Sequence, residues 1–235
     1  MCHGGAQRQE GTRFGGEVPV TEAFRRELEL LQAQGHRHAA ADLLRTQLET
    51  GALTAERLRL ACYLGHELSC AVLSGGGDDG AKAPEASDAW VDGLVDRCSV
   101  VESEGFPPGK EALLWATHAA CRVALRHFEA RAPSAVGPWQ EALEGFARWL
   151  ASPDPGLHLE ATARVPRPHA HAGATLPRSL FVLLQGVQAL LAPRSSGDFE
   201  RQALYQAVRL DAEGTRSAVR EVLVPWCLKG SSATV

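Results

Sequence analysis

The stretch "ERLRLACYLGHELSCAVLSGGG", residues 56–77, predicts two short helices joined by a tight turn. Leu58, Ala61 and Cys62 fall on one helical face, and the apolar pattern resumes after Gly65 and His66. Glycine readily adopts the left-handed conformation that ends many helices, so Gly65 is expected to cap the first helix. Because such a pair cannot cover its own apolar faces, it predicts a protein built from packed helix pairs.

Apolar residues at helical spacing extend this pattern along the chain in both directions. Thr54 is a predicted N-cap, with Leu53 and Leu58 at the spacing of a hydrophobic staple. The chain contains no isoleucine, and Ala and Leu supply most of its apolar content, so a sheet-dominated fold is not expected. The expected helices cover about residues 21–34, 36–50, 54–65, 67–73, 88–98, 110–130, 139–150, 157–164, 178–191, 199–210 and 212–228. The predicted fold is all-α: an irregular α-solenoid or multi-helix array of about ten antiparallel helices.

Glycine-rich and proline-rich segments divide the predicted helices into blocks. The expected order is a flexible tail over residues 1–20, an N-terminal helical block over 21–73 and a Gly-rich linker over 74–87. A central helical block over 88–164, a Pro-rich loop over 165–177 and C-terminal helices over 178–229 complete it.

Overall composition predicts a cytoplasmic globular protein. The formal net charge of −4 makes a nucleic-acid partner unlikely on balance, and the sequence contains no apolar run of membrane-spanning length. The N-terminus lacks the apolar region of a secretory signal. None of the six cysteines forms a C-x-x-C pair, so buried free thiols are expected rather than disulfides.

Several of the helical blocks resemble a known group of proteins. These are "GALTAERLRLACYLGHELSCAVL" (51–73), "AWVDGLV" (89–95), "EALLWATHAACRVAL" (111–125) and "EALEGFARWLASPDPGLHLEATA" (141–163). They resemble a poorly characterised family of helical-repeat proteins from myxobacteria and other GC-rich bacteria, and the first block also resembles HEAT- or Sel1-type helical pairs. The resemblance covers about half of the chain and carries no catalytic residues. It implies an all-α array with an interaction role.

Histidines offer two candidate metal sites, each with a simpler alternative. Cys62, His66 and Cys70 are spaced four residues apart, but Gly65 interrupts the helix, which favours a capping histidine between buried thiols. His169 and His171 alternate in a Pro-rich loop, which is a poor frame for a metal and favours a solvated loop. We therefore expect no metal and no cofactor.

A basic segment and an acidic segment are separated along the chain. No acid occurs between Glu160 and Asp198, whereas that interval contains Arg164, Arg167, Arg178 and Arg194. Conversely, most of the charged residues within 78–104 are acidic. The two segments could be solvated, could bind separate partners or could pair with each other. If a partner exists, we expect Arg164, Arg167, His169, His171 and Arg178 to contribute to the contact.

Two tryptophans lie beside the main apolar stripes of their predicted helices. Trp115 and Trp149 are therefore candidate partner-binding anchors, because exposed aromatic side chains often serve in this way. The alternative is that both pack against a neighbouring helix pair.

No catalytic motif stands out from the sequence. We found no nucleophile–base pair, no phosphate-binding glycine loop and no metal-ligand motif. The predicted function is a non-catalytic protein-interaction module, an adaptor or scaffold whose partner is another protein. A role as an accessory protein of a bacterial defence or toxin-immunity system belongs to the same class. The alternative is an enzyme, metal-dependent or metal-free, whose site is assembled from dispersed residues such as His118, His127 and His158.

Overall fold

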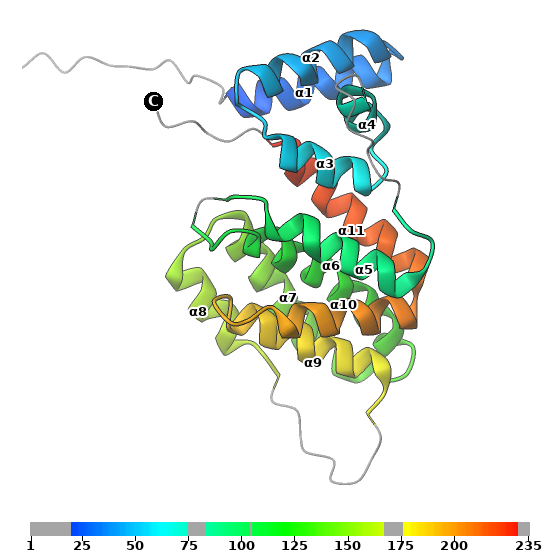
Figure 1. Ribbon diagram of the computed structural model, residues 1–235. Helices are drawn as coiled ribbons and strands as arrows, with labels where there is room; N and C mark the ends of the chain where they lie inside the picture. Colours follow the sequence, from blue (N-terminus) through cyan, green and yellow to red (C-terminus); the bar gives the residue numbers. More distant parts are fainter. Residues whose placement is uncertain (1–19, 75–82, 104, 167–175, 230–235) are drawn as a thin grey trace, which may run out of the picture.

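The computed structural model describes residues 20–74, 83–103, 105–166 and 176–229 (Figure 1). These residues form helices and connecting turns, with no strand among them, so the predicted all-α multi-helix fold is confirmed. The first four helices are α1 (Val20–Ala33), α2 (Arg37–Glu49), α3 (Ala55–Tyr63) and α4 (Glu67–Ser74). The others are α5 (Ser87–Ser99), α6 (Lys110–Glu129), α7 (Val136–Ala151), α8 (Pro155–Ala163), α9 (Arg178–Leu191), α10 (Asp198–Leu210) and α11 (Ala212–Cys227), with a 3₁₀ turn over Pro133–Ala135.

Helix α6 is the axis of the larger part of the molecule. Most of its residues are buried, and helices α5, α7, α9, α10 and α11 all pack on it. Alanines on several faces of α6 allow this close approach, and α9 comes nearest at Gly186, where a Cβ atom would lie 2.1 Å from Cys121 Sγ. In a solenoid each unit contacts only its neighbours along the chain. The observed arrangement is therefore the multi-helix array, gathered around one central helix, and not a solenoid stack.

A second, smaller core lies among the first four helices. It is formed by Phe24, Leu28, Ala40, Leu44, Leu53, Leu58, Cys62, Val72, Leu73 and Leu228. Helix α3 contributes to both cores, with Leu58 in the small one and Leu60 in the large one. Leu228, directly after α11, belongs to the small core, whereas Leu223 within α11 belongs to the large one. Helices α3 and α11 thus join the two parts, and Figure 1 shows α11 running between them.

The Gly65–His66 turn is the predicted joint between two packed helices. Gly65 has φ +84°, and His66 Nδ1 accepts a hydrogen bond from the Ser69 backbone N–H at 3.3 Å. His66 therefore caps α4, as the favoured interpretation of the sequence had it. Arg220 of α11 donates to the Gly65 carbonyl oxygen at 3.0 Å, which fastens the turn to the rest of the protein.

The cysteine prediction is wrong at two positions. Cys62 and Cys70 form a disulfide that links α3 to α4, with their Cα atoms 4.8 Å apart. The turn between them folds α4 back along α3, which brings residues eight positions apart to bridging distance. Cys98, Cys121 and Cys227 are buried free thiols, as expected.

The starts of α7 and α8 differ from the sequence-based expectation by more than one residue. Helix α7 begins at Val136, directly after the Pro133–Ala135 turn. Pro138 therefore falls in the first turn of the helix, where proline is tolerated. Helix α8 begins at Pro155, and Asp154 caps it by accepting from the N–H groups of Gly156 and Leu157. Helix α5 begins at Ser87, one residue earlier than expected, and its N-cap residue Ala86 provides no side-chain cap.

Leu58→Ala is expected to lower the free energy of unfolding by about 2–4 kcal/mol. Leu58 is fully buried in the small core, and Thr54 Oγ1 caps the same helix by accepting from the Arg57 N–H at 3.3 Å. Removing the side chain leaves a cavity where the helices meet. Urea unfolding measures the change, and a loss below about 0.5 kcal/mol would contradict the burial of Leu58.

Among the helices of the described segments, none combines the length and apolar composition that a bilayer crossing requires.

Candidate interaction surface

Of the predicted basic contact residues, the structure describes Arg164 and Arg178, and each has its own partner. Arg164 pairs with Glu160 one turn earlier in α8. Arg178, at the start of α9, donates to the Arg209 carbonyl oxygen at 3.0 Å. Arg167, His169 and His171 lie outside the described residues.

The acidic segment has partners other than the basic segment. Asp88 forms an ion pair with Arg209 of α10 at 2.8 Å, and Asp92 accepts a hydrogen bond from the Tyr205 hydroxyl. Arg216 of α11 donates to the Glu85 carbonyl oxygen at 2.7 Å. The start of α5 is therefore bound to α10 and α11. Among the described residues, neither Asp88 nor Asp92 pairs with the predicted basic segment.

The two candidate tryptophan anchors lie against neighbouring helices. Trp149 is only 6% exposed, and its ring centroid lies 5.3 Å from that of Phe106 and 4.5 Å from that of His158. Its assignment as an exposed anchor is therefore wrong, since the α7–α8 hairpin and the loop before α6 cover it. Trp115 is half-buried, packs edge-on against His118 and contributes its apolar surface to the large core.

The dispersed histidines of the alternative enzyme hypothesis have separate partners. His118 Nε2 donates to the Leu143 carbonyl oxygen at 3.0 Å, and burial lowers the pKa of His118 to about 4, so the ring is neutral at physiological pH. His158 Nε2 donates to the Leu190 carbonyl oxygen at 2.8 Å. Both side chains hold one helix to the next.

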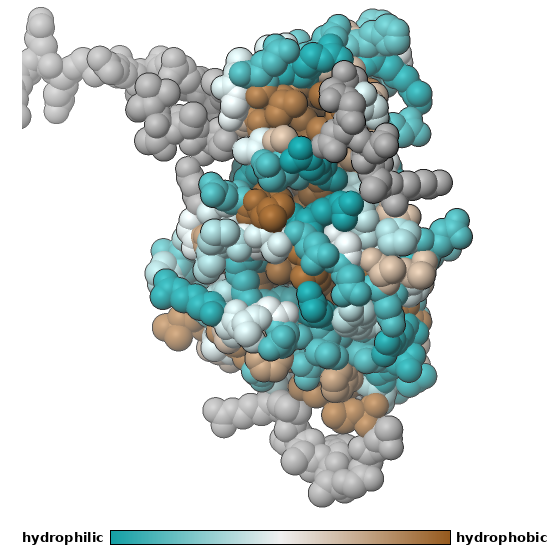
Figure 2. Space-filling model, viewed as in Figure 1, coloured by the Kyte–Doolittle hydropathy of each residue, from teal (hydrophilic) through white to brown (hydrophobic). Residues whose placement is uncertain are grey.

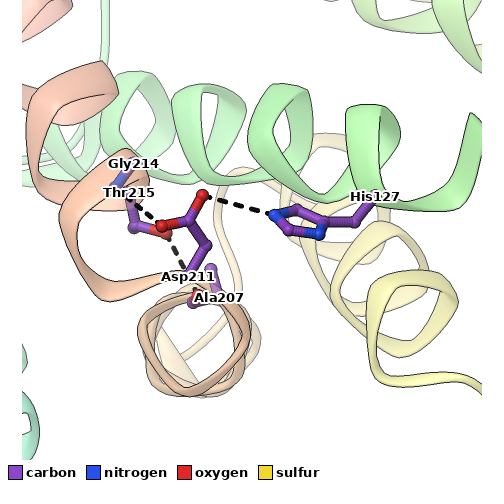
Figure 3. Close-up of polar contacts among 5 residues, drawn as sticks. All are labelled: His127, Ala207, Asp211, Gly214 and Thr215. Carbon is purple, nitrogen blue, oxygen red and sulfur yellow. Dashed lines mark hydrogen bonds and ion pairs between the residues drawn. The ribbon is translucent and has the colours of Figure 1, made fainter. Parts of the chain in front are cut away.

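His127 is the one of the three that contacts a carboxylate. Its Nε2 lies 3.3 Å from Oδ2 of Asp211, and both side chains are partly exposed (Figure 3). The other carboxylate oxygen of Asp211 accepts from the Gly214 N–H at 2.8 Å, so Asp211 caps α11. A Cβ atom at Gly214 would lie 2.2 Å from Asp211 Oδ2, so glycine leaves room for the carboxylate. Thr215 donates to the Ala207 carbonyl oxygen within the same corner. The pair joins the end of α6 to the α10–α11 corner.

Asp211→Ala is expected to lower the free energy of unfolding by about 1 kcal/mol near neutral pH, because the variant loses an N-cap. The hydrogen bond from the Gly214 N–H is the main cause that lowers the pKa of Asp211, and the neighbouring His127 lowers it further. A carboxyl group whose pKa is lowered in the folded state stabilises the fold at pH values above its unfolded-state pKa, which is about 3.9. That stabilisation is lost as the pH falls through the folded-state pKa.

The stability gap between wild type and Asp211→Ala should therefore be largest above about pH 5 and shrink towards pH 3. Thermal unfolding across this range measures it. Asp211→Asn keeps a capping acceptor without a titrating group, so it isolates the charge. A gap for Asp211→Ala that is constant from pH 6 to pH 3 would contradict the assignment.

The described residues do not assemble a metal centre. Within them, no group of three or more His, Cys, Asp or Glu side chains is arranged to hold an ion. Cys62 and Cys70, two of the three ligands considered at the Gly65–His66 turn, are joined to each other and cannot act as thiolate ligands in this state.

One end of the molecule gathers features that the sequence did not predict together. This region, called the α8 end, comprises residues 100–103 and 105–109, the end of α7, all of α8, the connection 192–197 and the first turn of α10. Its parts are tied together by the Phe106–Trp149 and Trp149–His158 ring contacts and by the hydrogen bond from His158 to Leu190. In Figure 1 it occupies the left side of the large part.

A buried ion pair fixes the base of the α8 end. Lys110, the first residue of α6, contacts the Glu200 carboxylate in the first turn of α10. The Lys110 side chain is 8% exposed and that of Glu200 is fully buried. Lys110 Nζ also donates to the Ser195 carbonyl oxygen at 3.1 Å. Neither Glu200 oxygen has a further hydrogen-bond partner among the described residues, so Lys110 alone compensates this carboxylate.

Large apolar side chains point to solvent at this end. Among the described residues, Leu159 of α8 is 71% exposed, Val100 after α5 is 59% exposed and Phe199 of α10 is 36% exposed. The two other exposed large apolar residues, Leu30 and Leu176, lie elsewhere. Figure 2 shows hydrophobic side chains at the lower left edge, in the position of α8 in Figure 1. Single exposed apolar residues are ordinary, but three of five at one end form a candidate contact surface.

None of these three residues was among the candidates drawn from the sequence. Leu159 follows Leu157 by two positions, which places the two on different faces of a helix, and only Leu157 packs against the core. That off-stripe spacing was the available signal.

The described residues form an all-α multi-helix protein with exposed apolar side chains at the α8 end. No protein-family model, curated protein or solved structure matches the chain.

Proposed function

We propose that this chain is a non-catalytic protein-interaction module whose partner binds the α8 end. The observation that carries the proposal is the exposure of Val100, Leu159 and Phe199 on one end of the molecule. Apolar side chains at the centre of an interface supply most of its binding free energy, and they act best on a frame that is already rigid.

Rigidity at the α8 end comes from contacts beneath the exposed side chains. Phe199 is next to Glu200, which Lys110 holds in place. Leu159 is next to His158, which is fixed between Trp149 and the Leu190 carbonyl oxygen. Val100 is next to Val101, whose carbonyl oxygen accepts from the Gly109 N–H at 2.7 Å. Each of the three exposed residues is thus adjacent in the chain to a residue held by a buried contact. The backbone beneath them therefore needs little ordering when a partner binds.

Charged side chains around this end suit a polar rim. Arg148, Glu160 and Arg164 form an exposed ion-pair group on α7 and α8. Exposed pairs of this kind add little affinity but favour a complementary partner over others. The proposed partner is therefore a protein with an apolar patch and mixed charges at its edge.

Leu159→Arg is the test variant, and Leu30→Arg is its matched control. Leu30 is a similarly exposed leucine, at 57%, on α1 in the small part of the molecule. Tagged wild type and both variants are used to recover partners from the native organism, with quantification by mass spectrometry. A partner recovered about tenfold less with Leu159→Arg and equally with Leu30→Arg supports the proposal, since such a loss corresponds to about 1.4 kcal/mol. Equal recovery of every partner by Leu159→Arg and wild type contradicts it.

A further inference from the structure

The Cys62–Cys70 disulfide sits at the attachment point of the small part of the molecule. Helix α2 packs on both α1 and α4, and α4 in turn packs on α3. Helix α3 is itself held firmly, because Leu60, Ala61 and Tyr63 belong to the large core and Arg57 donates to the Lys229 carbonyl oxygen. The disulfide joins this anchored helix to α4.

Helix α4 is short and packs on α2 and α3. It is an eight-residue helix whose buried apolar side chains are Val72 and Leu73. His66 caps it and lies 3.2 Å from the Gln32 side chain of α1. Helices of this length are not stable alone in water, so α4 depends on packing and on the cross-link.

The two cysteines of the disulfide differ in their exposure to solvent. Cys62 is buried, at 4% exposed, whereas Cys70 is partly exposed. The other described cysteines contrast with it: burial raises the pKa of both Cys121 and Cys227 to about 12 and the pKa of Cys98 well above its usual value. Because the thiolate is the reactive form, these three are inert in the folded protein.

We propose that the Cys62–Cys70 disulfide is a redox-controlled lock that holds α1, α2 and α4 on α3, and that a dithiol reductant releases them. A reductant thiolate attacks Cys70 Sγ, the S–S bond breaks, and Cys62 leaves as a thiolate and takes up a proton. The second thiol of the reductant then attacks the mixed disulfide. Cys70 leaves as a thiolate and is protonated, and the reductant becomes a cyclic disulfide. Two electrons and two protons pass from the dithiol to the protein.

Hydrogen exchange with and without dithiothreitol tests the lock. In the unreduced protein, Cys62 and Cys70 should resist alkylation. After reduction both should be alkylated under native conditions, and amide exchange in α1, α2 and α4 should rise roughly 10- to 100-fold because the cross-link no longer restricts opening. Exchange in α6 should not change, since its contacts lie in the large core. The amide exchange of the double variant Cys62→Ser/Cys70→Ser should match that of the reduced protein and should not change when dithiothreitol is added.

Two results would overturn the proposal. The first is alkylation of Cys62 and Cys70 before reduction, in protein purified under air. The second is unchanged exchange of α4 in protein whose two thiols are shown to be free. Both are measured on the wild-type chain, so they stand even if the double variant fails to fold.

Discussion

Lys110→Met is expected to lower the free energy of unfolding by about 3–5 kcal/mol, because it leaves the Glu200 carboxylate buried without its cation. Glu200 is fully buried and has no other partner among the described residues. The substitution keeps an unbranched apolar side chain of similar length, so the loss reports the charge rather than a cavity. Urea unfolding at pH 7 measures it.

The double variant Lys110→Met/Glu200→Gln distinguishes the cost of an uncompensated carboxylate from the cost of losing the ion pair itself. Removing both charges removes the uncompensated carboxylate, and buried ion pairs replaced together are often close to neutral in stability. We therefore expect the double variant to regain most of the stability lost by Lys110→Met alone. A cost below about 1 kcal/mol for Lys110→Met would contradict the burial of this pair.

Gly109→Ala is expected to cost about 3 kcal/mol or more, since a left-handed backbone and a backbone collision act together. Gly109 has φ +75°, and a Cβ atom there would lie 2.5 Å from Ser99 Cα and 2.7 Å from the Cys98 carbonyl oxygen. This contact is where the end of α5 crosses the start of α6. Relief would require moving main chain, which is costly in a close-packed interior.

Gly35→Ala is the matched control for this substitution. Gly35 has nearly the same φ, +74°, with nothing within 4 Å of its Cβ position. It should cost about 1 kcal/mol, from the left-handed conformation alone. Equal losses of unfolding free energy for the two variants would show that α5 and α6 do not approach as closely as the structure has them.

Much of the helical framework follows from local patterns. The turn at Gly65 and His66 could be predicted from the sequence, because a left-handed glycine and a capping side chain depend only on residues close by in the chain. Thr54 predicts its cap for the same reason. The central position of α6 could not be predicted in this way, because an alanine-rich helix with apolar residues on several faces fits many packings.

The features of the candidate surface depend on contacts between distant parts of the chain. Lys110 and Glu200 look like ordinary surface residues in the sequence, and only the meeting of two helix starts buries them together. Trp149 was a candidate anchor because it lies off its main stripe, and its contact with α8 matches the alternative, packing against a neighbouring helix. The disulfide was missed because eight residues separate its cysteines and the fold of the turn decides their distance.

Site-specific photo-crosslinking from position 159 tests the central claim, that the α8 end binds a protein partner, most directly. Benzoylphenylalanine placed at Leu159 is irradiated in the native organism, with the same group at Leu30 as the control. The account predicts a crosslinked protein from position 159 that is absent from position 30, and its loss when Phe199→Ser is added. Crosslinking from both positions alike, or from position 30 alone, would contradict the account.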